Sequence, residues 1–68
     1  MINVNLIRAK IAEKGMTQGE VAQKIGMSAN TFSTKMKNGR FGLDEADRMI
    51  NLLEIENPEL YFFANKVS

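Results

Sequence analysis

Residues Thr17 to Gly39 constrain the fold more than any other stretch, because they hold two short helical patterns separated by a tight turn. The first pattern opens with Thr17 and Glu20, three residues apart. This is the spacing of a capping box, in which each side chain satisfies a backbone N–H group at the helix start. We therefore predict a helix that begins at Gln18 and ends near Gly26, where a left-handed residue suits a helix end.

The second pattern follows Ser28, a residue type that commonly caps helix N-termini. Phe32 and Met36 stand four residues apart and so share one face, with polar residues around them. Gly39 then predicts the helix end, which gives a helix over about residues 29–37. Two helices joined by a tight glycine-containing turn form a helix-turn-helix, whose second helix can enter the major groove of DNA.

Three further helices are predicted around this pair. The first covers residues 1–14, where apolar residues recur at three and four positions, and either Asn3 or Asn5 can cap its N-terminus. The fourth covers residues 43–53, with Gly42 as its N-cap and Glu45 three residues later. The fifth covers residues 58 to about 66, with a proline in the first helical position, where proline is tolerated. The expected fold is all-α, a compact five-helix bundle that makes residues 1–68 one domain.

The apolar residues that face inward in each helical period are expected to form the core. They are Ile7, Ile11, Val21, Ile25, Phe32, Met36, Ala46, Met49, Ile50, Leu53, Leu60 and Phe63. Leu43 lies on the same predicted apolar face of the fourth helix as Ala46.

Composition excludes several classes of function. The 68 residues include no cysteine and no histidine, which excludes disulfides, nucleophile–base pairs that use either residue, and the usual nitrogen or sulfur metal sites. The carboxylates of Asp44, Glu45 and Asp47 suit the positive end of a helix better than acid–base catalysis. No apolar run is long enough to cross a membrane, and no signal pattern occurs. We expect a cytoplasmic protein that is not an enzyme and has no cofactor or metal.

The charges are distributed unevenly along the chain. Residues 1–40 carry seven Lys or Arg against two acids, whereas residues 41–68 carry two against six. The two parts have net charges of +5 and −4. A phosphate backbone could approach the first part, although charge clustering of this kind also arises by chance on a solvated helical surface.

The exposed side of the second motif helix carries side chains that suit the reading of base edges. Asn pairs with adenine, Thr and Ala methyl groups contact thymine, and Lys reaches guanine or a phosphate. The alternative is that small polar residues simply favour a short exposed helix. The candidate base-reading residues are Ala29, Asn30, Ser33, Thr34 and Lys37.

A resemblance to a known family supports the first interpretation. The run from Thr17-Gln18 through Val21-Ala22, Ile25-Gly26, Ser28, Phe32 and Asn38-Gly39 resembles the Cro/repressor-type (lambda-repressor-like) helix-turn-helix regulators of phages and bacteria. The segment LDEADRMINLL, residues 43–53, resembles a subgroup of small regulators from phages of Gram-positive hosts. Many members have an aliphatic residue at position 35, whereas this chain has Lys35 and places the apolar contact at Met36.

The resemblance implies a sequence-specific regulator of transcription that binds double-stranded DNA. In such proteins the glutamine that opens the first motif helix binds a phosphate and orients the second helix. The implied phosphate contacts are Gln18, Ser28, Asn38 and Arg40. Lys35, from the basic stretch between Glu20 and Asp44, completes the predicted phosphate contacts.

Two other functions compete with DNA reading. A protein-interaction module of the same fold, such as an antirepressor or an inhibitor, would present an apolar or acidic face on this helix, but the face here is polar and basic. RNA binding would need an accessible groove or an aromatic stacking platform. The major groove of A-form RNA is too deep and narrow for side chains to read, and no stacking platform is evident in the sequence, which argues against RNA.

The C-terminal helix predicts self-association. Leu60, Phe63 and Val67 recur at three and four residues and can face the core, which leaves Tyr61 and Phe62 outward as a dimerisation surface. The alternative is that Phe62 folds back over the first or fourth helix. Related regulators pair through this region, so the resemblance implies a homodimer on a palindromic operator, with recognition helices about 34 Å apart.

Overall fold

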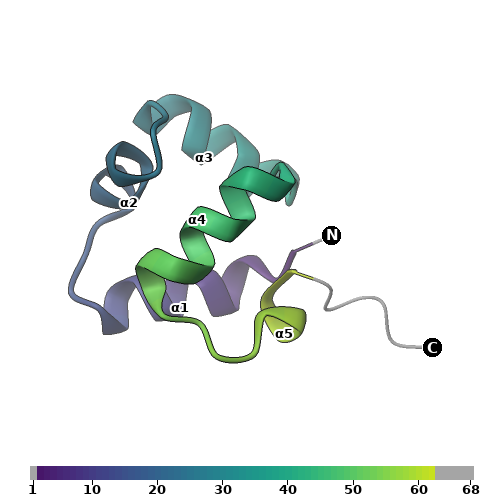
Figure 1. The fold of residues 1–68 in the computed structure, drawn as a ribbon. Helices are drawn as coiled ribbons and strands as arrows, with labels where there is room; N and C mark the ends of the chain where they lie inside the picture. The colour runs from purple at the N-terminus through teal and green to yellow at the C-terminus, as the bar shows by residue number, and fades with distance from the viewer. Residues whose placement is uncertain (1, 63–68) are drawn as a thin grey trace.

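Five α-helices account for most of residues 2–62, the part of the chain that the computed structural model describes (Figure 1). They are α1 (Val4–Glu13), α2 (Gln18–Lys24), α3 (Ala29–Asn38), α4 (Leu43–Leu53) and α5 (Pro58–Phe62). No strand occurs within these residues. The predicted all-α fold with a helix-turn-helix is confirmed.

The helix-turn-helix begins and ends where its local sequence signals predict. Thr17 Oγ1 accepts a hydrogen bond from the Glu20 N–H at 3.1 Å, and Glu20 Oε1 accepts one from the Thr17 N–H at 2.8 Å. Ser28 Oγ accepts from the Thr31 N–H at 3.1 Å and so caps α3. Gly26, in the turn, has a φ of 85°, a left-handed conformation that L side chains rarely adopt.

Two predicted helix boundaries differ from the structure. The first helix begins at Val4, three residues after the start of its predicted range. Asn3, one of its two candidate caps, is extended, and its Oδ1 accepts a hydrogen bond from the Leu6 N–H at 3.2 Å. The fifth helix is described only as Pro58–Phe62. The rest of its predicted range, residues 63–66, lies outside the described residues.

The helices are arranged in two tiers connected by α4. In Figure 1, α2 and α3 form the upper tier, α1 and α5 the lower, and α4 crosses in front from one to the other. Backbone hydrogen bonds connect the N-terminal segment to both tiers: Ile2 N–H donates to Gly39 O at 3.3 Å, and Asn3 N–H donates to Tyr61 O at 2.6 Å. Both ends of the described chain therefore lie near the end of α3.

Most of the predicted core is buried, and its centre is Phe32. The Phe32 side chain is fully buried, and its ring centroid lies 5.4 Å from that of Phe41. Ala46 and Ile50 are only partly buried but pack against the core. The buried residues are Ile7, Ile11, Val21, Ala22, Ile25, Phe32, Met36, Met49, Leu53, Ile55 and Phe62.

The apolar pattern was misleading for three leucine and phenylalanine positions. Leu60 is 54% exposed, so its predicted place in the core is wrong, and Phe62 is buried instead. Leu43 is 84% exposed, because at the first position of α4 it lies beyond the neighbouring helices that cover Met49 and Leu53. Phe63, also predicted in the core, lies outside the described residues.

None of the helices within residues 2–62 has the length and apolar character that a bilayer-spanning segment needs.

Candidate nucleic-acid interface

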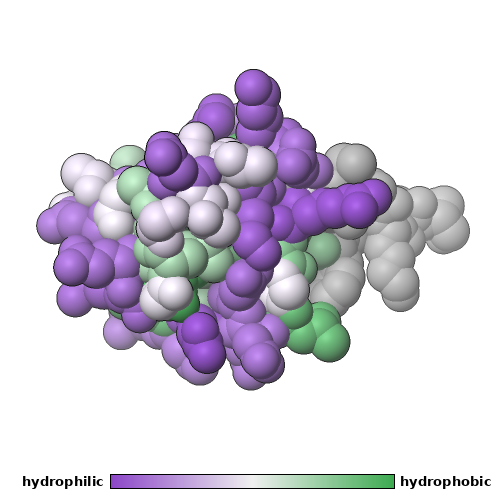
Figure 2. All heavy atoms as spheres, turned by 90° about the horizontal axis from the view of Figure 1, so that it is seen from above, coloured by the Kyte–Doolittle hydropathy of each residue, from purple (hydrophilic) through white to green (hydrophobic). Residues whose placement is uncertain are grey.

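The outer face of α3 is entirely polar apart from one alanine. Phe32 and Met36 are buried, which fixes the rotation of the helix and turns the remaining side chains outward. Figure 2 looks onto this side of the molecule and shows mostly hydrophilic and intermediate colours. All five predicted base-reading residues are exposed: Ala29, Asn30, Ser33, Thr34 and Lys37.

The helix-turn-helix and the residues that follow it carry exposed cations. Lys24, Lys37 and Arg40 are exposed, and no acidic side chain within residues 2–62 forms a salt bridge with any of them. The sequence has no acidic residue between Glu20 and Asp44. An unpaired cation near a helix that projects from the surface is available to a phosphate.

The predicted phosphate contacts differ in how exposed they are and in whether their polar atoms are already bound within the protein. Asn38 and Arg40 are exposed at the end of α3, and Gln18 is partly buried at the start of α2. Ser28 is exposed, but its hydroxyl is already used: it accepts from the Thr31 N–H and donates to Thr31 Oγ1 at 2.9 Å. The Ser28 hydroxyl is therefore engaged within the protein, on the backbone and side chain of Thr31.

Lys35 differs from the other predicted contacts because it is bound internally. Its Nζ donates to both carboxylate oxygens of Glu45 at 3.0 Å, and the two side chains are only 34% and 23% exposed. Glu45 Oε1 also accepts a hydrogen bond from the Gly42 N–H at 2.8 Å. The Gly42 hydrogen bond, followed by Lys35 and Arg48, lowers the pKa of Glu45 below its usual range. Glu45 therefore stays ionised and keeps Lys35 beside α4.

Arg48 is a structural contact of the motif that the sequence did not indicate. Its Nη1 donates to the backbone oxygen of Ile25 at 3.0 Å. Ile25 is the C-cap of α2, where carbonyl groups lack partners within the helix and the helix dipole favours a cation. The only available signal was that Arg48, three residues after Glu45, is the one basic residue of this helix.

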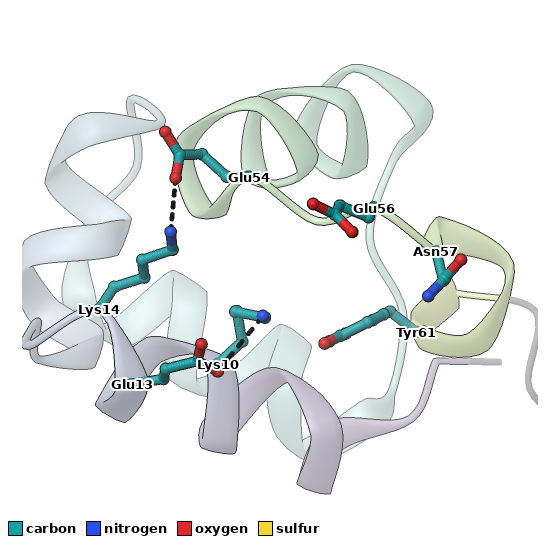
Figure 3. A pocket seen from close by; sticks show the side chains of 7 residues that line it. All are labelled: Lys10, Glu13, Lys14, Glu54, Glu56, Asn57 and Tyr61. Carbon is teal, nitrogen blue, oxygen red and sulfur yellow. Dashed lines mark hydrogen bonds and ion pairs between the residues drawn. The ribbon is translucent and has the colours of Figure 1, made fainter.

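A polar cleft of about 370 Å³ lies away from α3, between α1, the end of α4 and α5 (Figure 3). Lys14 Nζ lies 2.6 Å from Glu54 Oε1, and Lys10 Nζ lies 3.3 Å from Glu13 Oε1. The Glu13 hydrogen bond raises the pKa of Lys10, and the Lys14 hydrogen bond lowers that of Glu54. These lysines are neutralised locally, so the cleft does not extend the cationic surface of α3.

Tyr61, at the other end of the cleft, points its hydroxyl toward Lys10 in Figure 3.

Within residues 2–62, no group of three or more potential ligand side chains is arranged to hold a metal ion.

The outward orientation predicted for Phe62 is wrong. Only 5% of Phe62 is exposed, and it belongs to the core, while Tyr61 is partly buried. The reason is that α5 packs against α1, and Leu60 rather than Phe62 lies on the side away from that contact. The alternative, in which Phe62 folds back onto the bundle, describes the structure.

Comparison with known proteins agrees with this geometry. The model of a family described as the antitoxin Xre-like helix-turn-helix domain matches residues 9–54, which include all of α2, α3 and α4. No curated protein and no solved structure matches the chain. The match covers more than half of the chain and supports the Cro/Xre type of helix-turn-helix found in DNA-binding regulators. The chain belongs to the antitoxin Xre-like helix-turn-helix domain family.

Proposed function

We propose that this protein regulates transcription by binding a specific double-stranded DNA sequence, with α3 inserted in the major groove. The observation that carries this proposal is the exposed face of α3, which combines small polar side chains with unpaired cations while Phe32 and Met36 hold the opposite face. An α-helix fits the major groove, where each base pair presents a distinct pattern of donors and acceptors.

Direct readout is assigned to the five exposed side chains of α3. Asn30 has the amide that forms a bidentate pair with adenine, and Thr34 has both a hydroxyl and a methyl group. Lys37, one turn further along, reaches a guanine or the backbone. Ala29 and Ser33 complete the surface as short side chains that allow close approach.

Phosphate contacts are assigned to Gln18, Asn38 and Arg40. They lie at the start of α2 and at the end of α3, where a groove-bound helix meets the DNA backbone. Lys35 and Ser28 are left out of this set, because the Lys35 ammonium group is bound to Glu45 and the Ser28 hydroxyl both donates to and accepts from Thr31.

The test begins with selection from a random DNA pool, which yields the preferred site, its symmetry and its half-site spacing. On that site, Asn30→Ala and Thr34→Ala should each lose about 1–3 kcal/mol of binding free energy and relax discrimination at one position. Arg40→Ala should weaken binding to all sequences and reduce the salt dependence by about one phosphate contact. Arg8→Ala is the matched control, since Arg8 is an exposed cation on α1.

The result that contradicts direct readout is an equal loss on specific and random DNA for every α3 substitution. A selection that enriches no sequence would instead favour the protein-interaction module. The polar, cationic character of α3 argues against that alternative, because protein-binding surfaces are depleted in lysine at their centres.

A homodimer on a palindromic operator belongs to the same proposal. One small module buries only about 600–1,000 Å² on DNA, so a second copy is needed for tight specific binding. We assign the contact to the C-terminal region through Leu60 and Tyr61. The sequence pattern also predicts Phe62 on this surface, but Phe62 is buried in the core and is not part of the proposed contact.

A further inference from the structure

One turn of α4 reaches both helices of the helix-turn-helix. Glu45 and Arg48 are three residues apart and so lie on neighbouring positions of one helical face. Glu45 binds Lys35 of α3, and Arg48 binds the backbone oxygen of Ile25 at the end of α2. We call these two residues the α4 brace.

Glu45 binds the ammonium group of Lys35, which lies close to the proposed DNA-binding face of α3. Lys35 directly follows Thr34 on α3 and lies at the edge of the exposed face. Both carboxylate oxygens of Glu45 accept from its Nζ at 3.0 Å, while the Gly42 N–H fixes the carboxylate from the other side. A lysine held by two oxygens must lose those hydrogen bonds before it can bind a phosphate.

The Arg48 side of the brace closes over the turn of the motif. Besides its hydrogen bond to Ile25, Arg48 Nη1 lies 3.6 Å from the place that a Cβ at Gly26 would occupy. The guanidinium group therefore sits where α2 ends and the chain turns toward α3.

We propose that the α4 brace sets DNA specificity in two ways. Arg48 fixes the angle of α3 against α2, and Glu45 withholds Lys35 from DNA phosphates, so that the protein gains less sequence-independent affinity. This inference rests on the proposed function, since it concerns how α3 reads its site. Glu45 and Arg48 are positioning residues and touch no DNA.

The first experiment measures binding to the selected site and to a random duplex as a function of salt concentration. On B-form DNA, the logarithm of the affinity falls with the logarithm of the salt concentration, with a slope of about 0.9 per phosphate contact. The slope therefore gives the number of phosphate contacts. Lys35→Met alone should leave the slope unchanged. Glu45→Gln should steepen the slope by about 0.9 and bring random DNA closer in affinity to the specific site. The double variant, Glu45→Gln with Lys35→Met, should return to the parental slope.

Asp44→Asn is the matched control for the change in net charge. Asp44 lies on the same turn of α4, is exposed, and forms no salt bridge within residues 2–62. A general charge effect would steepen the slope as much for Asp44→Asn as for Glu45→Gln, and Lys35→Met would not reverse it. Either that result or a shallower slope for Lys35→Met alone overturns the role of Glu45.

Arg48→Met tests the other side of the brace while it keeps the aliphatic part of the side chain. The ratio of specific to random affinity should fall about 10-fold, similar to the loss of one base-pair contact. A structural role alone would lower the melting temperature and weaken binding to both DNAs equally, which would overturn the positioning role.

A parental protein without any sequence preference would overturn the proposed function. In that case the salt slopes of the Glu45 and Lys35 variants would still decide the role of Glu45. Absence of all DNA binding would overturn both.

Discussion

Phe32 attaches α3 to the rest of the molecule. It is fully buried, it packs on Phe41, and the rest of α3 buries only Met36. Phe32→Ala should lower the free energy of unfolding by about 3–5 kcal/mol, a large part of the total for a small domain. Denaturant unfolding measures this loss. Ser33→Ala, at the exposed neighbouring position, should change stability by less than about 0.5 kcal/mol. Similar small losses for both would mean that the rotation assigned to α3 is wrong.

Glu45 should make the stability of the protein depend on pH. Its folded pKa is lowered, mainly by the Gly42 N–H and then by Lys35. The stability that it contributes is therefore fully present above the pKa of an unfolded glutamate, about 4.3, and is lost as pH falls through the folded pKa. In the Glu45→Gln variant, the free energy of unfolding should therefore change less with pH in this acidic range.

The partner variant separates the two causes of this pH dependence. Lys35→Met should remove only part of it, because the hydrogen bond from Gly42 remains. Urea unfolding at a series of pH values from 6 downward is the measurement. A Glu45→Gln protein that follows the parental pH curve would show that the carboxylate is not held as the structure describes.

At the scale of the elements, the turn between α2 and α3 depends on Gly26. Its φ of 85° strains any L side chain, so Gly26→Ala should cost about 1–2 kcal/mol of stability. Gly15 is a matched control, since its φ is 72° and a Cβ there would meet nothing within 4 Å. Both substitutions should destabilise similarly in thermal melts. Only Gly26→Ala should also weaken specific DNA binding, because Gly26 lies between the two motif helices. Equal DNA affinities would show that the turn tolerates the change.

Gly19 allows a test of how closely α2 approaches the DNA backbone. It is exposed in the first turn of α2, and a Cβ there would lie 3.8 Å from Thr17 Oγ1, an ordinary contact. Gly19→Ala should therefore raise stability by about 0.4–1 kcal/mol. A simultaneous loss of DNA affinity would show that a phosphate lies close to this backbone, whereas unchanged affinity would mark Gly19 as a tolerated weak position.

The boundaries of the elements were predictable wherever a local side chain ends or begins a helix. Thr17 with Glu20, and Ser28, satisfy backbone N–H groups within three residues, so sequence spacing alone locates α2 and α3. The rotation of α5 was not predictable in this way. Its apolar spacing allows more than one inward face, and packing on α1 decides that Phe62 is inside and Leu60 outside.

At the scale of the whole molecule, the sequence predicted the basic character of the helix-turn-helix half but not which of its cations form ion pairs. The uneven charge distribution is visible in the sequence, and the exposed cations Lys24, Lys37 and Arg40 agree with it. The pairs Lys14–Glu54 and Lys35–Glu45 join residues 40 and 10 positions apart. Such pairs depend on how the helices are packed, which local patterns do not specify. The basic stretch between Glu20 and Asp44 predicts Lys35 at a phosphate, and the sequence pattern does not reveal its pairing with Glu45.

Assembly is the property of the whole molecule that the structure changes most. Leu60 is 54% exposed, so Leu60→Gln should leave the folded monomer intact and weaken the proposed dimer. Phe62→Ala should instead destabilise the monomer, because Phe62 is buried. Sedimentation across protein concentration, with and without a palindromic site, measures the dimer.

Leu43→Gln is the control for this experiment, because Leu43 is 84% exposed but lies at the start of α4, outside the C-terminal region. Loss of association in Leu43→Gln but not in Leu60→Gln would move the interface to the start of α4. A parental protein that stays monomeric and binds one half-site as tightly as a palindrome would contradict dimerisation altogether. Since a single module contacts little DNA, such a result would require α3 and its flanking loops to supply all the affinity.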